Sequence, residues 1–182
     1  MSRIIENPSE LILNTAKEIL YNDGYNSLSM RNVAKACNIG LGTIYNYYPT
    51  KKSLVIEMMT CYWSEFIIKT QTIVKSDNEF YNKLKKIFDD LSIFIKTFKE
   101  IWLKPELYAN PDYVKDGVEK EDIYIEKLVL LIEDILIKEN KIKGSITSYE
   151  LAKFIVLNYI TIVQMSTFKY SDFEIILKQL LD

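Results

Sequence analysis

Residues 38–54 read NIGLGTIYNYYPTKKSL and combine small, hydroxyl-bearing and basic side chains without a single acidic one. Thr43, Tyr45 and Tyr47 offer hydroxyl donors, and Lys51 adds a positive charge a short distance further on. Such hydroxyl and amine groups bind phosphate oxygens, whereas a carboxylate would be repelled by them. The glycines of the segment leave the backbone open to close approach. The pattern therefore predicts a surface that binds a row of phosphates.

Composition excludes several other kinds of chemistry. The chain contains no histidine, which rules out Ser-His-Asp and Cys-His nucleophiles and any zinc site built on His. Cys37 and Cys61 form no CxxC pair and are expected to be small buried apolar residues. The GLGT sequence lacks the Gly-Lys-Ser/Thr ending of a phosphate-binding P-loop. We expect a protein that is not an enzyme and that needs no cofactor or metal.

The helices that would carry the phosphate-binding residues can be predicted from caps and breakers. An amphipathic helix is expected over residues 10–22, and Ser29 is a good N-cap for a second helix over 30–37. A very short helix over 41–47 follows a glycine-containing turn, with Ile44 expected to dock it inward. Two short helices joined in this way form a helix-turn-helix, whose second helix enters the major groove of DNA.

The rest of the chain also predicts helices. Only five glycines and four prolines interrupt it, and no convincing strand alternation occurs. Thr50 is expected to cap a long helix that ends near residue 74, and further helices are expected over 80–102, within 105–117, and over 117–140, 149–168 and 172–181. The predicted fold is all-α with eight or nine helices. A three-helix DNA-binding domain over 1–52 would precede a larger helical ligand-binding and dimerisation domain over 53–182.

Charge is distributed unevenly between these two parts. Residues 1–52 carry a net charge of +2 and residues 53–182 carry −4, within a total of −2. A basic head on an acidic body fits one end that faces DNA. The polar N-terminus lacks the apolar core of a signal peptide, and no apolar run reaches the roughly 18 residues that a membrane span needs. We expect a cytoplasmic protein with no membrane partner.

The segment GTIYNYYPTKKSL, with SLSMRNVAKACNIG before it, resembles the DNA-binding domain of the TetR family of bacterial transcriptional regulators. The family pattern is Gly-Thr-(Leu/Ile)-Tyr, two variable residues, an aromatic residue, then Lys and Leu, and the preceding helix carries Arg-x-(Ile/Val)-Ala. The matching positions are Gly42, Thr43, Ile44, Tyr45, Tyr48, Lys51 and Leu54, with Arg31, Val33 and Ala34 upstream. The resemblance covers about residues 10–55, which is less than a third of the chain.

The resemblance implies a role for each matching position. Residues placed at phosphates would be Thr43, Tyr45, Tyr47 and Lys51, residues nearest the base edges would be Arg31, Leu41, Gly42 and Asn46, and Ser29 completes the expected DNA-contact set. Position 41 is Leu where many members have a polar or basic residue, so it can touch a thymine methyl but cannot hydrogen-bond to a base. Position 47 is Tyr where His is common, which removes positive charge from that contact.

The family further implies a homodimeric, ligand-responsive regulator, most often a repressor. One short recognition helix buries too little surface for tight specific binding, so two copies would read a near-palindromic operator with half-sites about 34–36 Å apart. A small apolar or aromatic effector would bind in the larger domain and lower the affinity for DNA. Aromatic residues that could line its cavity, or simply pack a core, are Trp63, Phe66, Phe94, Phe98, Trp102, Tyr124 and Phe154.

The helix expected over 149–168 is apolar nearly all the way round and needs cover on two sides. One side can wall the cavity, and the other can meet the second copy together with the apolar stripe of the last helix. The expected interface residues are Tyr159, Ile162, Val163, Phe173, Ile176, Leu177 and Leu180.

Two alternatives remain open. A DNA-binding regulator of the same fold could respond to a protein partner or to no ligand, and a completely filled core would favour it. An all-helical enzyme or carrier of small molecules is a remote alternative, because the chain has no histidine and no convergent polar cluster.

Overall fold

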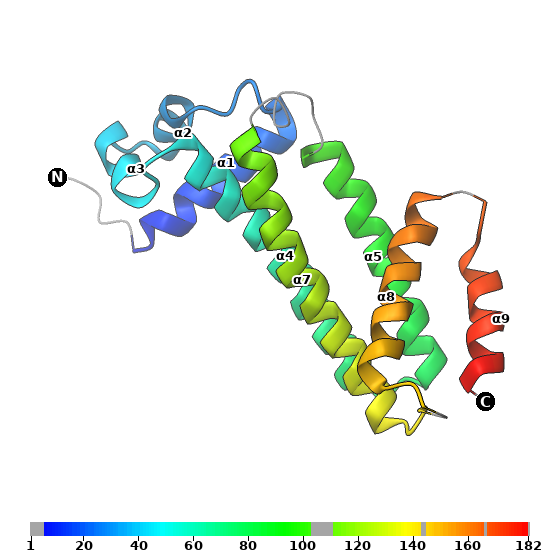
Figure 1. Cartoon of the computed structure of the whole chain (residues 1–182). Coiled ribbons are helices and arrows are strands. Elements are labelled where there is room, and N and C mark those ends of the chain that lie inside the picture. Colours follow the sequence, from blue (N-terminus) through cyan, green and yellow to red (C-terminus); the bar gives the residue numbers. More distant parts are fainter. Residues whose placement is uncertain (1–5, 103–110, 143–144, 166, 182) are drawn as a thin grey trace. The chain divides into compact units, whose positions relative to one another are not determined.

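The computed structural model describes residues 6–102, 111–142, 145–165 and 167–181. In these ranges the chain is helical, without strands, which confirms the all-α prediction (Figure 1). The eight helices of the described residues are α1 Pro8–Asp23, α2 Met30–Cys37, α3 Leu41–Tyr47, α4 Lys51–Lys75, α5 Phe80–Trp102, α7 Pro111–Lys138, α8 Ser148–Gln164 and α9 Tyr170–Leu181. None of the described helices is long and apolar enough to cross a membrane.

The chain forms two compact units, each with its own core. One unit draws on Met1–Tyr62 and Lys99–Val118, and the other on Trp63–Phe98 and Glu119–Asp182. The first unit contains α1 to α3, and the second contains most of α5 together with α8 and α9. The proposed division into residues 1–52 and 53–182 stays a prediction.

Local capping explains why the first helices lie where the sequence predicts them. The Ser29 hydroxyl accepts a hydrogen bond from the backbone N–H of Asn32 at 3.1 Å, which confirms the predicted cap of α2. At the start of α4, Thr50 Oγ1 accepts from the N–H of Ser53 at 3.0 Å. The N–H of Thr50 in turn donates to Ser53 Oγ at 3.1 Å. This reciprocal pair satisfies backbone donors that the helix leaves unpaired.

The turn between α2 and α3 owes its shape to an asparagine. Asn38 adopts the left-handed conformation at φ 54°, and its N–H donates to the carbonyls of Ala34 and Lys35. Asparagine tolerates this region better than most residues because its short polar side chain can bond locally. Gly40 has an ordinary φ of −66° and caps α3 without a side chain. A tight turn therefore joins α2 and α3, the two helices of the predicted helix-turn-helix.

The end of α1 requires a glycine for a different reason. Gly24 has φ 79° and ψ 173°, a conformation that is open almost only to glycine. Its N–H donates to Leu20 O at 3.2 Å, and its own carbonyl accepts from Ser27 N at 3.2 Å. These bonds build the compact turn that leads into α2.

Replacing Gly24 by Ala should therefore lower the stability of the fold by about 1–3 kcal/mol, through backbone strain alone. An added Cβ would meet no atom within 4 Å, so no steric clash contributes. Thermal denaturation followed by circular dichroism measures the loss as a lower Tm. Gly42→Ala is the matched control, because its added Cβ also meets open space and α3 is helical there. An equal drop in both variants would contradict the strain argument.

The later helices correct three predicted boundaries. Helix α7 begins at Pro111 rather than at residue 117, because proline fits the first helical position, where no N–H is needed. Helix α8 ends at Gln164 and not at 168, with Met165 extended at φ −116°. Helix α9 begins at Tyr170 instead of 172, since a carboxylate oxygen of Asp172 accepts from the N–H of Lys169. The short helix expected within 105–117 lies partly outside the described residues.

Helices α5, α8 and α9 lie side by side (Figure 1). A buried aromatic group holds them together. Tyr159 of α8 is fully buried, and its hydroxyl donates to Leu84 O of α5 at 3.1 Å. Its ring packs against Phe88, Tyr170 and Phe173 at centroid distances of 5.3, 5.9 and 5.7 Å. Burial raises the pKa of Tyr159 well above its ordinary value, so the hydroxyl stays a neutral donor.

Candidate nucleic-acid interface

Helix α3 presents one polar face and buries the other. Ile44 is fully buried, as predicted, and Tyr48, just after the helix, is 7% exposed, so both anchor the helix to its unit. Tyr45 and Tyr47 are 46% and 45% exposed, and Asn46 is exposed between them. A short helix that leaves two aromatic hydroxyls and an amide in solvent has the donors to bind phosphates and base edges.

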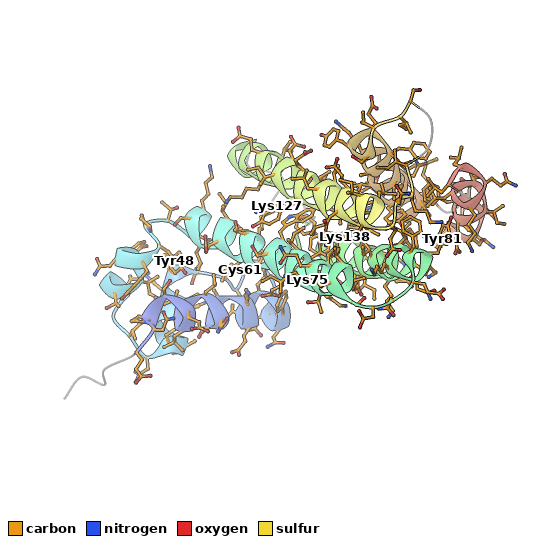
Figure 2. The ribbon with its side chains drawn as sticks, turned by 90° about the horizontal axis from the view of Figure 1, so that it is seen from below. Tyr48, Cys61, Lys75, Tyr81, Lys127 and Lys138 are labelled. Atoms are coloured by element: carbon orange, nitrogen blue, oxygen red, sulfur yellow. The ribbon has the colours of Figure 1, made fainter. Side chains whose placement is uncertain are left out.

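The far end of α3 is tied to the start of α1. The hydroxyls of Tyr48 and Ser9 lie 3.0 Å apart and share a hydrogen bond, and Tyr48 is marked in Figure 2. Burial raises the pKa of the Tyr48 hydroxyl, an effect that the bond to Ser9 partly offsets. This bond, together with the burial of Tyr48, restrains the end of α3 against α1.

The supporting helix α2 carries two further residues of the predicted set. Ser29 is half-buried, and although its oxygen caps α2, its proton remains available to a phosphate. Arg31 is exposed in the first turn of α2, and no side chain of the described residues pairs with its guanidinium. Leu41 and Thr43 are half-buried and Gly42 is exposed in the first turn of α3. The predicted contact residues thus come from three neighbouring helix segments of one unit.

Lys51 is engaged in a way that its sequence position does not indicate. It is half-buried at the first position of α4, and its Nζ lies 3.6 Å from the centroid of the Tyr25 ring. The same Nζ donates to the backbone carbonyl of Tyr25 at 3.3 Å. Tyr25 follows Gly24 in the turn after α1 and was absent from the predicted set. In the sequence, Tyr25 stands out only as an aromatic residue that follows a glycine expected to end a helix, and this pattern alone does not indicate a contact with Lys51.

Arg31 yields a prediction about base choice. A guanidinium can bind a guanine through two hydrogen bonds, and such a pair discriminates against other bases by about 1–3 kcal/mol. Arg31→Ala should therefore relax the preference at one base pair in each half-site without unfolding α2, because the side chain is exposed. Selection of bound sequences from a random duplex library measures the change. The same selected motif from parent and variant would exclude direct readout by Arg31.

Five of the seven aromatic residues predicted for an effector cavity come together in the second unit. Trp63 lies 4.4 Å from Phe94, 5.5 Å from Tyr124 and 6.1 Å from Phe98, and Phe66 lies 4.8 Å from Phe94, between ring centroids. The side chain of Trp102 lies outside the described residues. Phe154 does not join this aromatic cluster; it is 42% exposed and faces Phe173 at 6.2 Å.

Polar groups border the aromatic cluster. The hydroxyls of Ser64 and Tyr124 lie 2.8 Å apart, and the Nζ of Lys127 lies 4.5 Å from the centroid of the Tyr124 ring. Lys127 is on α7 and is labelled in Figure 2. The rings are close enough to touch one another, so an apolar ligand would bind here only if one or more of them moved.

The residues predicted for a dimer interface separate into two groups. Tyr159, Ile162, Phe173 and Leu177 are at most 7% exposed, so they have no surface to offer a second chain. Val163 is half-buried, whereas Ile176 and Leu180 are 44% and 55% exposed. Phe154, Leu157 and Thr161 of α8 are exposed in the single chain, and the expectation that a second copy covers one side of this helix stays a prediction.

Comparison with known proteins supports the local geometry. Residues 12–58 match the family model described as bacterial regulatory proteins, tetR family. The uncharacterized HTH-type transcriptional regulator YuxN of Bacillus subtilis is 31% identical over 98 residues, which are 52% of this chain and 34% of that protein. The chain thus spans only about a third of the length of this curated relative.

Solved structures share the fold over nearly the whole chain. A transcriptional regulator from Cytophaga hutchinsonii has a TM-score of 0.71 at 20% identity, covering 94% of this chain and 91% of that one. FadR from Bacillus subtilis, in complex with stearoyl-CoA, has a TM-score of 0.60 at 17% identity, covering 95% of this chain and 97% of that one. At these identities the likeness establishes the all-helical architecture.

Proposed function

Because the chain belongs, through its N-terminal helices, to the TetR family of bacterial regulatory proteins, we propose that it is a dimeric transcriptional repressor. It binds operator DNA through α3 and leaves the operator when a small apolar or aromatic effector binds. Residues 1–52 bind DNA, and residues 53–182 bind the effector and form the dimer. The protein works in the cytoplasm, where it reaches the chromosome.

The orientation of α3 is the observation that carries this proposal. Its buried residue Ile44 faces the core, while Tyr45, Asn46 and Tyr47 face solvent. A helix docked in the major groove needs this division, because its inner face must hold its angle while its outer face meets bases and phosphates. No acid occurs between residues 38 and 54 to repel the DNA backbone.

A second copy of the chain completes the binding unit, since one short helix buries too little surface for a specific site. We place the dimer contact on a face formed by α8 and α9. Its exposed apolar residues are Phe154, Leu157, Ile176 and Leu180. The contact between Phe154 and Phe173 shows that the two helices pack against each other, and we propose that their exposed apolar residues form one surface. Covering this face in both copies would form a four-helix contact.

The aromatic cluster around Trp63 is the proposed effector site. Its rings offer an apolar lining, and Lys127 and the Ser64 and Tyr124 hydroxyls offer a polar border. The structural relative FadR of Bacillus subtilis, solved in complex with stearoyl-CoA, gives a precedent for a ligand with a long apolar chain on this fold. An effector that requires the rings to separate would favour a different conformation of the protein, and DNA affinity would fall if that conformation fits the operator less well.

Fluorescence anisotropy with DNA from upstream of the gene tests the proposal. The protein should bind this fragment more tightly than random DNA of equal length, and apolar or aromatic compounds should release it in a dose-dependent way. Absence of any binding would contradict the regulator, and an enzyme or carrier would then have to be considered. Binding that no compound affects would instead favour control by a protein partner or by no ligand.

A further inference from the structure

The pairing of Lys51 with Tyr25 points to a determinant of DNA affinity outside the recognition motif. Lys51 occupies the first position of α4, where the helix dipole disfavours a positive charge. Its ammonium group nevertheless has a defined place, because the electron-rich face of the Tyr25 ring lies 3.6 Å away and the Tyr25 carbonyl accepts one of its protons at 3.3 Å.

Tyr25 is itself held firmly by the turn that contains it. Its carbonyl also accepts from the backbone N–H of Leu28 at 3.1 Å, and Leu28 is 1% exposed in the core of the unit. The preceding Gly24 and the bond from Ser27 N to its carbonyl close the same turn. The ammonium group of Lys51 is thus anchored to a part of the backbone that the core keeps in place.

An anchored ammonium group differs from a mobile one when it meets a phosphate. A free lysine side chain loses rotamer freedom when it binds, whereas one already held in position loses less. An ammonium group has three protons, and the bond to the Tyr25 carbonyl leaves two of them for phosphate oxygens. We propose that Tyr25 is a positioning residue that holds Lys51 ready for a DNA phosphate. This proposal rests on the proposed DNA-binding function.

Binding to a random-sequence duplex tests this role, because phosphate contacts do not depend on base sequence. Four variants of the full chain are compared with the parent: Tyr25→Phe, Tyr25→Leu, Lys51→Met and the double variant Tyr25→Leu/Lys51→Met. Lys51→Met should weaken binding about tenfold. It should also make the fall of log affinity with log salt shallower, by about one unit of slope per half-site. Tyr25→Phe keeps the ring and the carbonyl and should bind like the parent.

The decisive comparison is between Tyr25→Leu and the double variant. If Tyr25 acts through Lys51, Tyr25→Leu weakens binding in the parent background but has no further effect once Lys51 is Met, since changes at coupled sites are not additive. Equal losses in both backgrounds would overturn the proposal, as would parent-like binding by Tyr25→Leu. If the parent protein binds no duplex at low salt, the proposed DNA-binding function fails, and the role of Tyr25 fails with it. If the parent binds but the variants do not behave as expected, only the role of Tyr25 fails.

A spectroscopic measurement is independent of DNA and of how well Tyr25→Leu folds. In the full-length parent protein, the ε-methylene protons of Lys51 should resonate upfield of those of other lysines, because they lie near the face of an aromatic ring. The shift should persist in Tyr25→Phe. Ordinary lysine shifts at Lys51 in the parent would overturn the anchored geometry.

Discussion

Leu157→Asp should convert the protein into a monomer and abolish operator binding, although the change lies far along the chain from the recognition helix. Leu157 is 49% exposed on α8, on the face proposed to meet the second copy. Closing that face over the variant would bring two carboxylates into a dry seam, which should raise the dissociation constant of the dimer by about a thousandfold. Sedimentation velocity at micromolar concentration and anisotropy with operator DNA measure the two effects.

Leu130→Asp provides the matched control. Leu130 is the same residue type and 50% exposed, but it lies on α7, outside the proposed face. This variant should stay dimeric and keep its affinity for DNA. Circular dichroism should show both variants folded, because neither residue is buried. A dimeric Leu157→Asp would refute the proposed face, and a monomeric Leu130→Asp would place the contact on α7.

Removing the hydroxyls of Tyr45 and Tyr47 should weaken operator binding by at least about a hundredfold, because hydrogen bonds to charged groups contribute about 1.5–3 kcal/mol each. The change is Tyr45→Phe combined with Tyr47→Phe, which keeps both rings. Tyrosine hydroxyls are neutral and release no counterions, so the salt slope should stay unchanged. Anisotropy titrations at several salt concentrations separate this behaviour from that of Lys51→Met.

Tyr21→Phe is the control for the loss of an exposed hydroxyl. Tyr21 is 47% exposed, close to the 46% and 45% of Tyr45 and Tyr47, but it lies on α1. Its replacement should leave operator affinity within about twofold, as is usual for surface changes away from a binding site. If the double variant binds like Tyr21→Phe, the hydroxyls do not contact DNA. A lower salt slope in the double variant would mean that a charged contact had also moved.

Helix boundaries in the first fifty residues follow closely from local signals. Ser29 and Thr50 act on backbone groups within three residues of themselves, so the sequence nearby is sufficient to predict them. The predicted boundaries of α7, α8 and α9 are wrong because they depend on weaker cues. One such cue is Asp172, which lies within α9 and whose carboxylate accepts from the N–H of Lys169, just before the helix. Pro111 illustrates the difficulty, because proline is common both in turns and at the first position of a helix, so the local sequence does not distinguish the two.

The aromatic cluster was predicted only as a set of candidates. Spacing on each helix allowed any of the residues to face inward, and contacts between α4, α5 and α7 then selected Trp63, Phe94 and Tyr124. Phe154 was assigned to the same set and instead lies at the exposed face of α8. Which aromatic residues meet depends on how helices distant in sequence pack, and no local pattern contains that information.

By itself, the sequence determined the all-helical class, the helix-turn-helix and the resemblance to the TetR family, because caps, breakers and the motif are short-range features of the sequence. The tertiary structure alone decided that Tyr159 faces the core while Leu157 faces solvent, since a helix that is apolar on all sides has no preferred face until its neighbours cover one. It also decided the partner of Lys51, which lies 26 residues away and becomes a neighbour only when α4 packs beside the turn after α1.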